Sequence, residues 1–157
     1  MDHTTGMSVR SAVSGLGREP PAALHTRLEF EIAAGVQAPT VARRVVERLG
    51  AELDARRLDE VRLLVTELVT NCVRHAGISR ETLITVSLEL TESSLHVAVS
   101  NPGAAFDAPV PPDPGEPVEG GRGLWLVEKL ADRWGIDDVH EARVWFEVTR
   151  AAAVAGP

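Results

Sequence analysis

The sequence predicts an α+β fold, a two-layer sandwich in which a mixed, mostly antiparallel sheet is covered on one face by helices. Segments with period-two hydrophobicity, typical of strands, occur in pairs and do not alternate one by one with helices. Two longer segments carry apolar residues three and four apart, as in a helix that buries one face. The predicted order is strand, helix, helix, strand, strand, long loop, helix, strand, strand.

The composition describes an ordinary globular domain that stays out of membranes. The 157 residues are 44% hydrophobic and 25% charged, which suits one domain with a sizeable core. The net charge of −7 argues against a general nucleic-acid binder, which needs a basic face. A single cysteine, Cys72, excludes an internal disulfide and suits a reducing compartment. Because the chain shows neither a membrane-spanning apolar run nor a signal peptide, we expect a cytoplasmic protein.

The first periodic segment follows a polar N-terminal stretch. Residues 1–24 are predicted to be a flexible tail, and residues 25–150 the folded domain. Leu28, Phe30 and Ile32 alternate with charged residues, which predicts a half-buried strand.

Two helices are predicted next. The first covers Ala38 to Leu53, with Pro39 in its first turn, where the missing N–H costs nothing. The second covers Ala55 to His75 and stops at Gly77, a residue suited to the left-handed turn after a helix. Its buried stripe is predicted to be Leu58, Val61, Val65, Leu68 and Cys72.

A hairpin and a long loop come after the helices. Residues 84–90 and 95–99 alternate in hydrophobicity and predict two paired strands with one wet face. The periodicity then disappears between Asn101 and Gly123, and five prolines occur between residues 109 and 117. Connections in compact domains are mostly ~4–6 residues long, so this loop is either a linker or a functional lid. Because the remaining segment is too short for its own core, we predict a lid at about residues 107–122.

The chain is predicted to finish with a helix and a hairpin. Leu124 to Trp134 has helical spacing, and Gly135 is predicted to end that helix. Residues 136–139 and 144–148 are predicted to form the last hairpin, and residues 151–157 a C-terminal tail.

The second helix carries a pair of residues with chemical potential. Glu67 and Asn71 are four positions apart and share one helix face, turned away from the core stripe. A carboxylate can accept a proton from a nucleophile, and an amide oxygen is a ligand suited to Mg²⁺. Taken alone, most such pairs are solvated surface.

A glycine run precedes the last predicted helix. Consecutive glycines at residues 120, 121 and 123 let the backbone approach a ligand closely, and a helix N-terminus attracts phosphate. A flexible hinge is the alternative interpretation. A third segment, Asn101 to Phe106, follows a strand end, where a polar side chain can recognise a nucleobase. Its alternative is a simple turn, since Asn-Pro and Pro-Gly are turn dipeptides.

In this order, these segments resemble the GHKL (Bergerat-fold) ATPase and kinase superfamily. The resemblance is closest to the bacterial anti-sigma-factor serine/threonine kinases and their actinobacterial relatives. It covers roughly Leu28 to Thr149 and is carried by Glu67-Leu-Val-Thr-Asn71-Cys-Val-Arg74-His75-Ala76 and Gly120-Gly-Arg-Gly-Leu-Trp-Leu-Val127.

The resemblance implies a role for each matching residue. Glu67 would be the catalytic base that activates a hydroxyl of a protein substrate, and Asn71 would hold Mg²⁺ against the phosphates of ATP. For His75 a packed or helix-capping histidine is the alternative. The implied nucleotide-binding residues are Asn71, Arg74, His75, Asn101, Gly103, Ala105, Gly121, Arg122, Gly123 and Leu124. The implied partners are a sigma factor and its anti-sigma antagonist, and a homodimer through the first strand and helix is expected.

The strand-end segment departs from the family pattern. The family has Asp where this chain has Asn101, and glycine where it has Ala105, while Gly103 is retained. Loss of a charge-assisted hydrogen bond could cost ~1–2 kcal/mol of nucleotide affinity. The amide NH₂ of Asn101 could also donate to a guanine O6, which predicts relaxed base selectivity.

Two functions are carried forward from the sequence. The first is an ATP-dependent serine/threonine kinase that phosphorylates an anti-sigma antagonist and sequesters a sigma factor. The second is a non-catalytic interaction module with a degenerate site. Intact Glu67 and Asn71 favour the kinase, and Asn101 with Ala105 favours the module. A two-component ATPase module is disfavoured because no phospho-acceptor histidine helix is visible.

Overall fold

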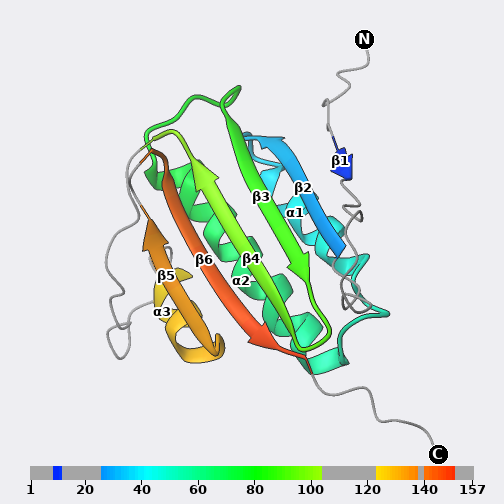
Figure 1. The fold of residues 1–157 in the computed structure, drawn as a ribbon. Coiled ribbons are helices and arrows are strands. Elements are labelled where there is room, and N and C mark those ends of the chain that lie inside the picture. The colour runs from blue at the N-terminus through cyan, green and yellow to red at the C-terminus, as the bar shows by residue number, and fades with distance from the viewer. Residues whose placement is uncertain (1–8, 12–25, 104–122, 138–139, 151–157) are drawn as a thin grey trace, which may run out of the picture.

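The computed structural model describes residues 9–11, 26–103, 123–137 and 140–150 and forms one six-stranded sheet with three helices (Figure 1). The strand order is β1-β2-β3-β4-β6-β5, and all neighbouring strands run antiparallel. The elements are β1 (Val9–Ser11), β2 (Thr26–Ala33), α1 (Ala38–Glu47), α2 (Ala55–His75), β3 (Leu83–Leu90), β4 (Ser94–Asn101), α3 (Gly123–Leu130), β5 (Arg133–Asp137) and β6 (Ala142–Thr149). None of the described helices is long and apolar enough to cross a bilayer.

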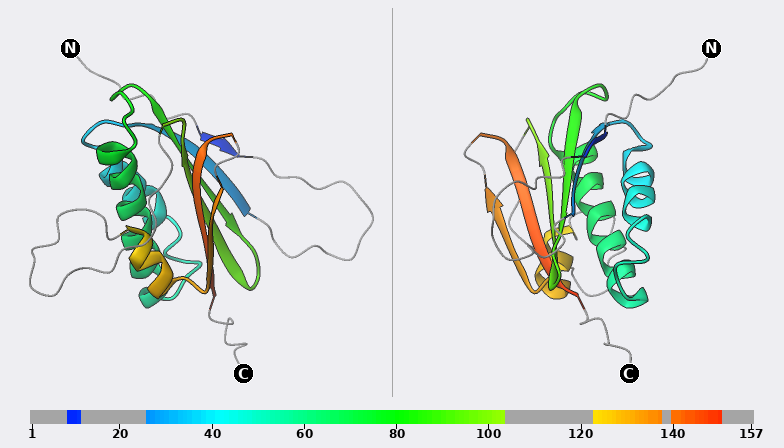
Figure 2. Two further views of the ribbon diagram at one scale, coloured as in Figure 1. Left: turned by 90° about the vertical axis from the view of Figure 1, so that its left-hand side faces the viewer. Right: turned by 45° about the vertical axis from the view of Figure 1, so that its right-hand side comes forward.

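The helices cover one face of the sheet and leave the other face without a helix in the described part of the chain (Figure 2). Strand side chains alternate between the two faces, so the apolar residues of each period-two pattern lie on the face that packs against the helices. Phe30 and Phe146 come from the sheet and Leu64 from α2, and all three are at most 1% exposed. The predicted α+β sandwich is confirmed.

Helix α2 lies at the centre of the helical layer and has the predicted limits. The Asp54 carboxylate caps its start by accepting the Arg57 N–H at 2.8 Å. At its end Gly77 has φ +65°, the left-handed turn that glycine adopts without strain. Val61, Val65 and Leu68 of the predicted stripe are fully buried.

Helix α1 is shorter than predicted. It ends at Glu47, whereas the apolar spacing predicted a helix as far as Leu53. Three successive N–H groups, those of Arg48, Leu49 and Gly50, bond to the carbonyl three residues back, which tightens the chain into turns. Leu53 is nevertheless buried, so the spacing reflected burial beyond the helix end.

The helix predicted over 124–134 was wrong at its C-terminal end. Helix α3 stops at Leu130, and Trp134 and Gly135 belong to β5. The chain joins the sheet at Asp132, whose N–H donates to the Glu147 carbonyl and whose carboxylate accepts the Thr149 N–H. Gly135 does not end a helix. It lies within β5 and leaves room for the Trp145 ring, because a Cβ there would lie 2.7–2.8 Å from ring atoms of Trp145.

Strand β1 was not predicted. Val9–Ser11 pairs with β2, with Val9 opposite Phe30, within the segment assigned to a tail. Three residues give too short a periodic pattern to be recognised in a sequence. The predicted lid and the C-terminal tail lie outside the described residues, so both stay predictions.

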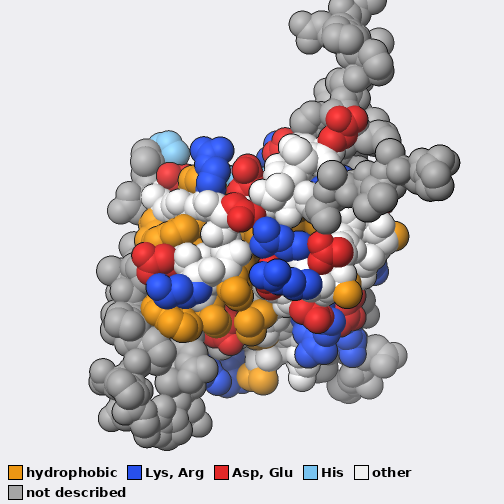
Figure 3. Space-filling model, turned by 90° about the horizontal axis from the view of Figure 1, so that it is seen from below, with side chains coloured by type: hydrophobic (Ala, Val, Ile, Leu, Met, Phe, Trp, Pro, Cys, Tyr) orange, Lys and Arg blue, Asp and Glu red, His pale blue; other side chains and the backbone are white. Residues whose placement is uncertain are grey.

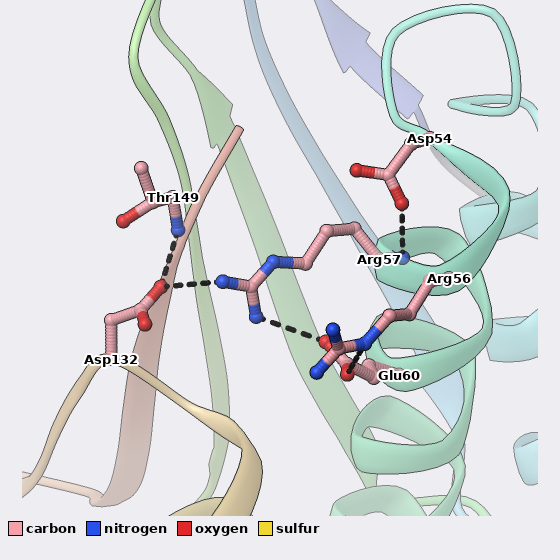
Figure 4. A network of polar contacts seen from close by, with 6 residues as sticks. All are labelled: Asp54, Arg56, Arg57, Glu60, Asp132 and Thr149. Carbon is pink, nitrogen blue, oxygen red and sulfur yellow. Dashed lines mark hydrogen bonds and ion pairs between the residues drawn. The ribbon is translucent and has the colours of Figure 1, made fainter. Parts of the chain in front are cut away.

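A polar network ties the start of α2 to the end of the sheet. The Arg57 guanidinium bonds to Asp132 at 3.2 Å and to Glu60 at 2.9 Å (Figure 4). Arg150 donates to the Thr91 carbonyl at 2.6 Å and to the Glu52 carbonyl at 3.0 Å. Acidic and basic side chains are interleaved across this end of the molecule when it is seen from below (Figure 3).

This network predicts a contribution to acid stability from Asp132. The Thr149 N–H that its carboxylate accepts, and then Arg57, hold the pKa of Asp132 below its ordinary value. Its stabilisation is therefore present above the ordinary carboxylate pKa and lost as pH falls through the lower folded pKa. Because the side chain is 42% exposed, we expect about 1 kcal/mol or less. Between about pH 5 and pH 2, the free energy of unfolding measured in urea should depend less steeply on pH in Asp132→Asn than in the wild type. The more exposed Asp59→Asn is the matched comparison, and an equal change in both variants would contradict the assignment.

Candidate functional site

Three chain segments meet at the C-terminal half of α2. Glu67 and Asn71 are half-buried, and each precedes a fully buried residue, Leu68 and Cys72 respectively. Because the buried neighbours face the sheet, Glu67 and Asn71 lie along the margin of the helix where α3 approaches. The fold therefore fixes both side chains on a rigid element at the edge of the core.

The N-terminus of α3 rests on this margin. A Cβ at Gly123 would lie 2.5 Å from Asn71 Nδ2 and 3.6 Å from the Glu67 carbonyl oxygen. Only glycine fits this approach without moving Asn71. The first residue of α3 thus brings the free N–H groups of a helix N-terminus next to Glu67 and Asn71, an arrangement that attracts anions.

The end of β4 is hydrogen-bonded to α2 at Cys72, the residue that follows Asn71. Asn101 is 1% exposed, and its Nδ2 donates to Cys72 Sγ at 3.3 Å. Its Oδ1 accepts the Gly103 N–H at 2.8 Å. Burial raises the pKa of the Cys72 thiol to about 12, so the thiol stays protonated. Asn71 and Cys72 are adjacent, so the strand end and the α3 N-terminus reach neighbouring positions of one helix.

Gly103 closes the turn after β4 against the end of α2. A Cβ there would overlap the carbonyl oxygen of Ala76 and lie 2.5 Å from Ile78 Cγ2. The glycine is required by this close approach, since its φ is not in the left-handed region. The retained glycine therefore has a structural role that is visible without any ligand.

The structure brings together four of the predicted site residues and separates others from them. Glu67, Asn71, Gly123 and Asn101 converge, the last through Cys72. Arg74 is exposed. The Leu124 side chain is 4% exposed in the core, which leaves only its backbone for a ligand. The side chain of His75 and the whole of Ala105, Gly121 and Arg122 lie outside the described residues.

Cys72 was missed as a site residue. Its place on the core stripe predicted burial, which is confirmed, but not a hydrogen bond to the strand end. No signal in the sequence pointed to this bond, because it is a tertiary contact between residues 29 positions apart.

The polar groups of the site fit the phosphates and magnesium ion of a nucleotide better than they fit its base. The Nδ2 side of Asn71 faces Gly123, which leaves the amide oxygen for a hard cation, and Glu67 adds a carboxylate one turn away. The α3 N-terminus supplies donors for phosphate. Asn101 keeps one lone pair and one N–H beyond its internal bonds, so its capacity to recognise a base is reduced.

Comparison with known proteins shows the family of this chain. Residues 32–147 match the model of the histidine kinase-like ATPase domain. The serine-protein kinase RsbW of Listeria monocytogenes is 31% identical over 126 residues, covering 71% of this chain and 79% of that protein. The serine-protein kinase RsbW of Staphylococcus aureus (strain MRSA252) is 32% identical over 100 residues, covering 56% and 62%.

The match spans both halves of the site, from β2 to β6, and so includes Glu67, Asn71, Asn101 and Gly123. The resemblance predicted from the sequence is confirmed. The chain belongs to the family of histidine kinase-like ATPase domains, with serine-protein kinases among its relatives.

Proposed function

We propose that this protein binds ATP with Mg²⁺ and phosphorylates a serine or threonine of an anti-sigma antagonist, and that it sequesters a sigma factor. The observation that carries the proposal is the close approach of Gly123 to the Asn71 side-chain amide and to the Glu67 main-chain carbonyl, which sets a helix N-terminus against the turn of α2 that bears both residues. The relatives named serine-protein kinases support the phosphoryl transfer.

Each residue would contribute a separate task. The ATP–Mg²⁺ complex supplies the transferable phosphate and neutralises its charge. Asn71 would hold the cation, and the N–H groups at the start of α3 would position the phosphates. Glu67 would take the proton from the substrate hydroxyl while the oxygen–phosphorus bond forms and the bond to the ADP oxygen breaks. The predicted lid at 107–122 would close over the nucleotide.

A direct test uses the purified chain, Mg²⁺, γ-labelled ATP and a candidate antagonist protein. Label on a serine or threonine of the antagonist supports the kinase. ATP binding without transfer supports the alternative, a non-catalytic module. The Asn101 amide is already hydrogen-bonded within the protein, to Cys72 and Gly103, and this favours that alternative. Absence of ATP binding at all would overturn the proposal.

Asn101→Asp is expected to raise ATP affinity. The carboxylate can still accept the Gly103 N–H, and the protonated Cys72 thiol can reverse its role and donate to it. The added charge is expected to strengthen ATP binding by roughly tenfold. Calorimetric titration of ATP and GTP into both proteins measures this effect. If GTP binds neither protein, the prediction of relaxed base selectivity is wrong.

Gly123→Ala is expected to weaken Mg²⁺–ATP binding with little loss of stability. The new Cβ would meet the end of the Asn71 side chain, which can rotate away and so lose its place at the phosphates. A misplacement of this size can cost roughly tenfold to hundredfold in function. Titration of ATP and a thermal melt on the same sample separate the two effects. Unchanged affinity would show that Asn71 does not act through this contact.

A further inference from the structure

The outer side of α2, which is turned away from the sheet, changes in character along the helix (Figure 2). The charged side chains of its N-terminal half are engaged in ion pairs: Arg56–Glu60, Arg57–Glu60, Arg62–Asp59 and Arg62–Glu47. Between Arg62 and Arg74 the sequence has one charged residue, Glu67. The proposed catalytic base therefore lies in a stretch of helix that is otherwise uncharged.

Leu63 is an exposed apolar residue at the start of this uncharged stretch. It is 42% exposed, although it lies well inside a helix of 21 residues. Residues four apart are neighbours on a helix surface, so Leu63 lies beside Glu67. A single exposed leucine is ordinary in itself. Here, however, it is the apolar neighbour of the residue to which a substrate hydroxyl must come.

Two threonines continue the surface from Leu63 along Glu67. The Thr66 hydroxyl donates to the Arg62 carbonyl at 2.6 Å, and the Thr70 hydroxyl donates to the Thr66 carbonyl at 2.7 Å. A threonine hydroxyl has one O–H, so neither side chain keeps a donor for a partner. Leu63, Thr66 and Thr70, which follow one another at spacings of three and four, are called the neutral strip below.

The charge of Glu67 restricts what can dock on the neutral strip. Its carboxylate forms no hydrogen bond or ion pair with any residue in the described part of the chain. A lysine or arginine next to the accepting hydroxyl would pair with this carboxylate and keep it from the hydroxyl proton. An aspartate or glutamate at that place would be repelled. The segment that presents the hydroxyl therefore has to be uncharged.

We propose that the neutral strip is the docking surface for the phospho-acceptor segment of the protein substrate. The segment is uncharged and extended, and it carries an apolar residue two positions from the accepting serine or threonine. This inference rests on the proposed kinase activity and names the substrate class of that site.

The spacing of the helix fixes the position of the apolar residue. Leu63 and Glu67 are about 6 Å apart along the helix axis, at about 1.5 Å per residue. In an extended segment, residues two positions apart point to the same side and are separated by about 6.6 Å. The apolar side chain therefore packs on Leu63 when the hydroxyl meets the Glu67 carboxylate.

Replacement of Leu63 separates docking from chemistry. The acceptor in this test is the antagonist protein that takes label from γ-labelled ATP in the wild-type reaction. Leu63→Ala is expected to raise KM for that protein about tenfold, because the contact with one leucine side chain is lost. We expect kcat and ATP affinity to stay within about twofold of the wild type. Leu63→Met keeps the apolar volume and is expected to retain the wild-type KM.

Leu83→Ala is the matched control for Leu63→Ala. Leu83 is 44% exposed, nearly as much as Leu63, but it belongs to β3. It precedes the buried Ile84, so its side chain points to the sheet face opposite the helices. We expect the same KM, kcat and ATP affinity as in the wild type. A thermal melt of each variant checks that the exposed substitutions leave the fold intact.

A double-mutant cycle tests the register. The apolar residue two positions from the labelled residue of the antagonist is replaced by alanine, alone and together with Leu63→Ala. If the two side chains touch, the combined change raises KM little more than either substitution does alone. Additive effects would show that they do not touch and would overturn the proposed register.

The remaining outcomes separate this inference from the proposed function. An unchanged KM in Leu63→Ala overturns the inference alone, as does a labelled residue with charged neighbours or without an apolar residue two positions away. A loss of ATP affinity in Leu63→Ala also overturns it, because Leu63 would then support the nucleotide site. If the wild type transfers no label to any antagonist protein, the proposed function fails and this inference fails with it.

Discussion

Gly103→Ala is expected to lower the free energy of unfolding by about 3 kcal/mol or more. The added Cβ would overlap the Ala76 carbonyl oxygen, and a backbone atom cannot rotate away as a side chain can. Ile78 Cγ2, at 2.5 Å, blocks the other side. Relief would require the end of α2 and the turn after β4 to separate. That movement would also strain the bond from the Gly103 N–H to Asn101 and the bond from Asn101 to Cys72.

The matched control for Gly103→Ala is Gly35→Ala. Gly35 lies in the loop between β2 and α1, has no atom within 4 Å of an added Cβ and does not have a positive φ. Its replacement should be neutral or stabilise by about 0.4–1 kcal/mol, because alanine restricts the unfolded chain. Urea unfolding of the three proteins measures both values. Equal stability of the two variants would show that the strand-end turn is not packed as described.

The fold was largely predictable because its elements satisfy local rules and burial at the same time. In α2 the apolar spacing and Gly77 both indicate one helix, and its limits were predicted correctly. The prediction failed where the same residue pattern is compatible with two local structures. Leu53 has helical spacing from α1 but is buried from a turn, and Gly135 looks like a helix stop but makes room for Trp145.

The candidate site was predictable in part, for a different reason. The residues of α2 are four apart, so their shared face follows from helix geometry alone. The contact of Gly123 with Asn71 is a tertiary packing event across some fifty residues of sequence, and only the family resemblance implied it. The role of Cys72 could not be predicted, because it depends on which helical turn the end of β4 reaches.

The presence of Asn101, where the family pattern has Asp, has a physical explanation as well. A carboxylate at position 101 would carry its charge into a buried position beside a protonated thiol. The neutral amide avoids that desolvation cost, since it meets Gly103 as an acceptor and Cys72 as a donor. In the proposed function, structural stability at this turn and strong recognition of a base would therefore place opposing demands on position 101.

Glu67→Gln is expected to lower the rate of phosphate transfer by about 10²–10⁴-fold while ATP affinity stays within about twofold of the wild type. Glutamine has nearly the shape of glutamate, so the margin of α2 beside Gly123 is preserved. It cannot accept the proton of the substrate hydroxyl, which is the task assigned to Glu67 in the proposed reaction. Because the loss would fall on the transfer step alone, single-turnover transfer from γ-labelled ATP is the measurement that reports it.

Glu128→Gln provides the control for Glu67→Gln, since Glu128 is an exposed carboxylate on α3 and its loss changes the net charge equally. We expect its transfer rate to match that of the wild type. A Glu67→Gln variant that loses ATP binding and transfer together would assign Glu67 to holding the nucleotide and not to proton transfer. A variant that transfers phosphate at the wild-type rate would remove Glu67 from the reaction. Because Glu67 is half-buried beside the α3 N-terminus, only the combination of intact binding and slow transfer fits a general base positioned at this margin.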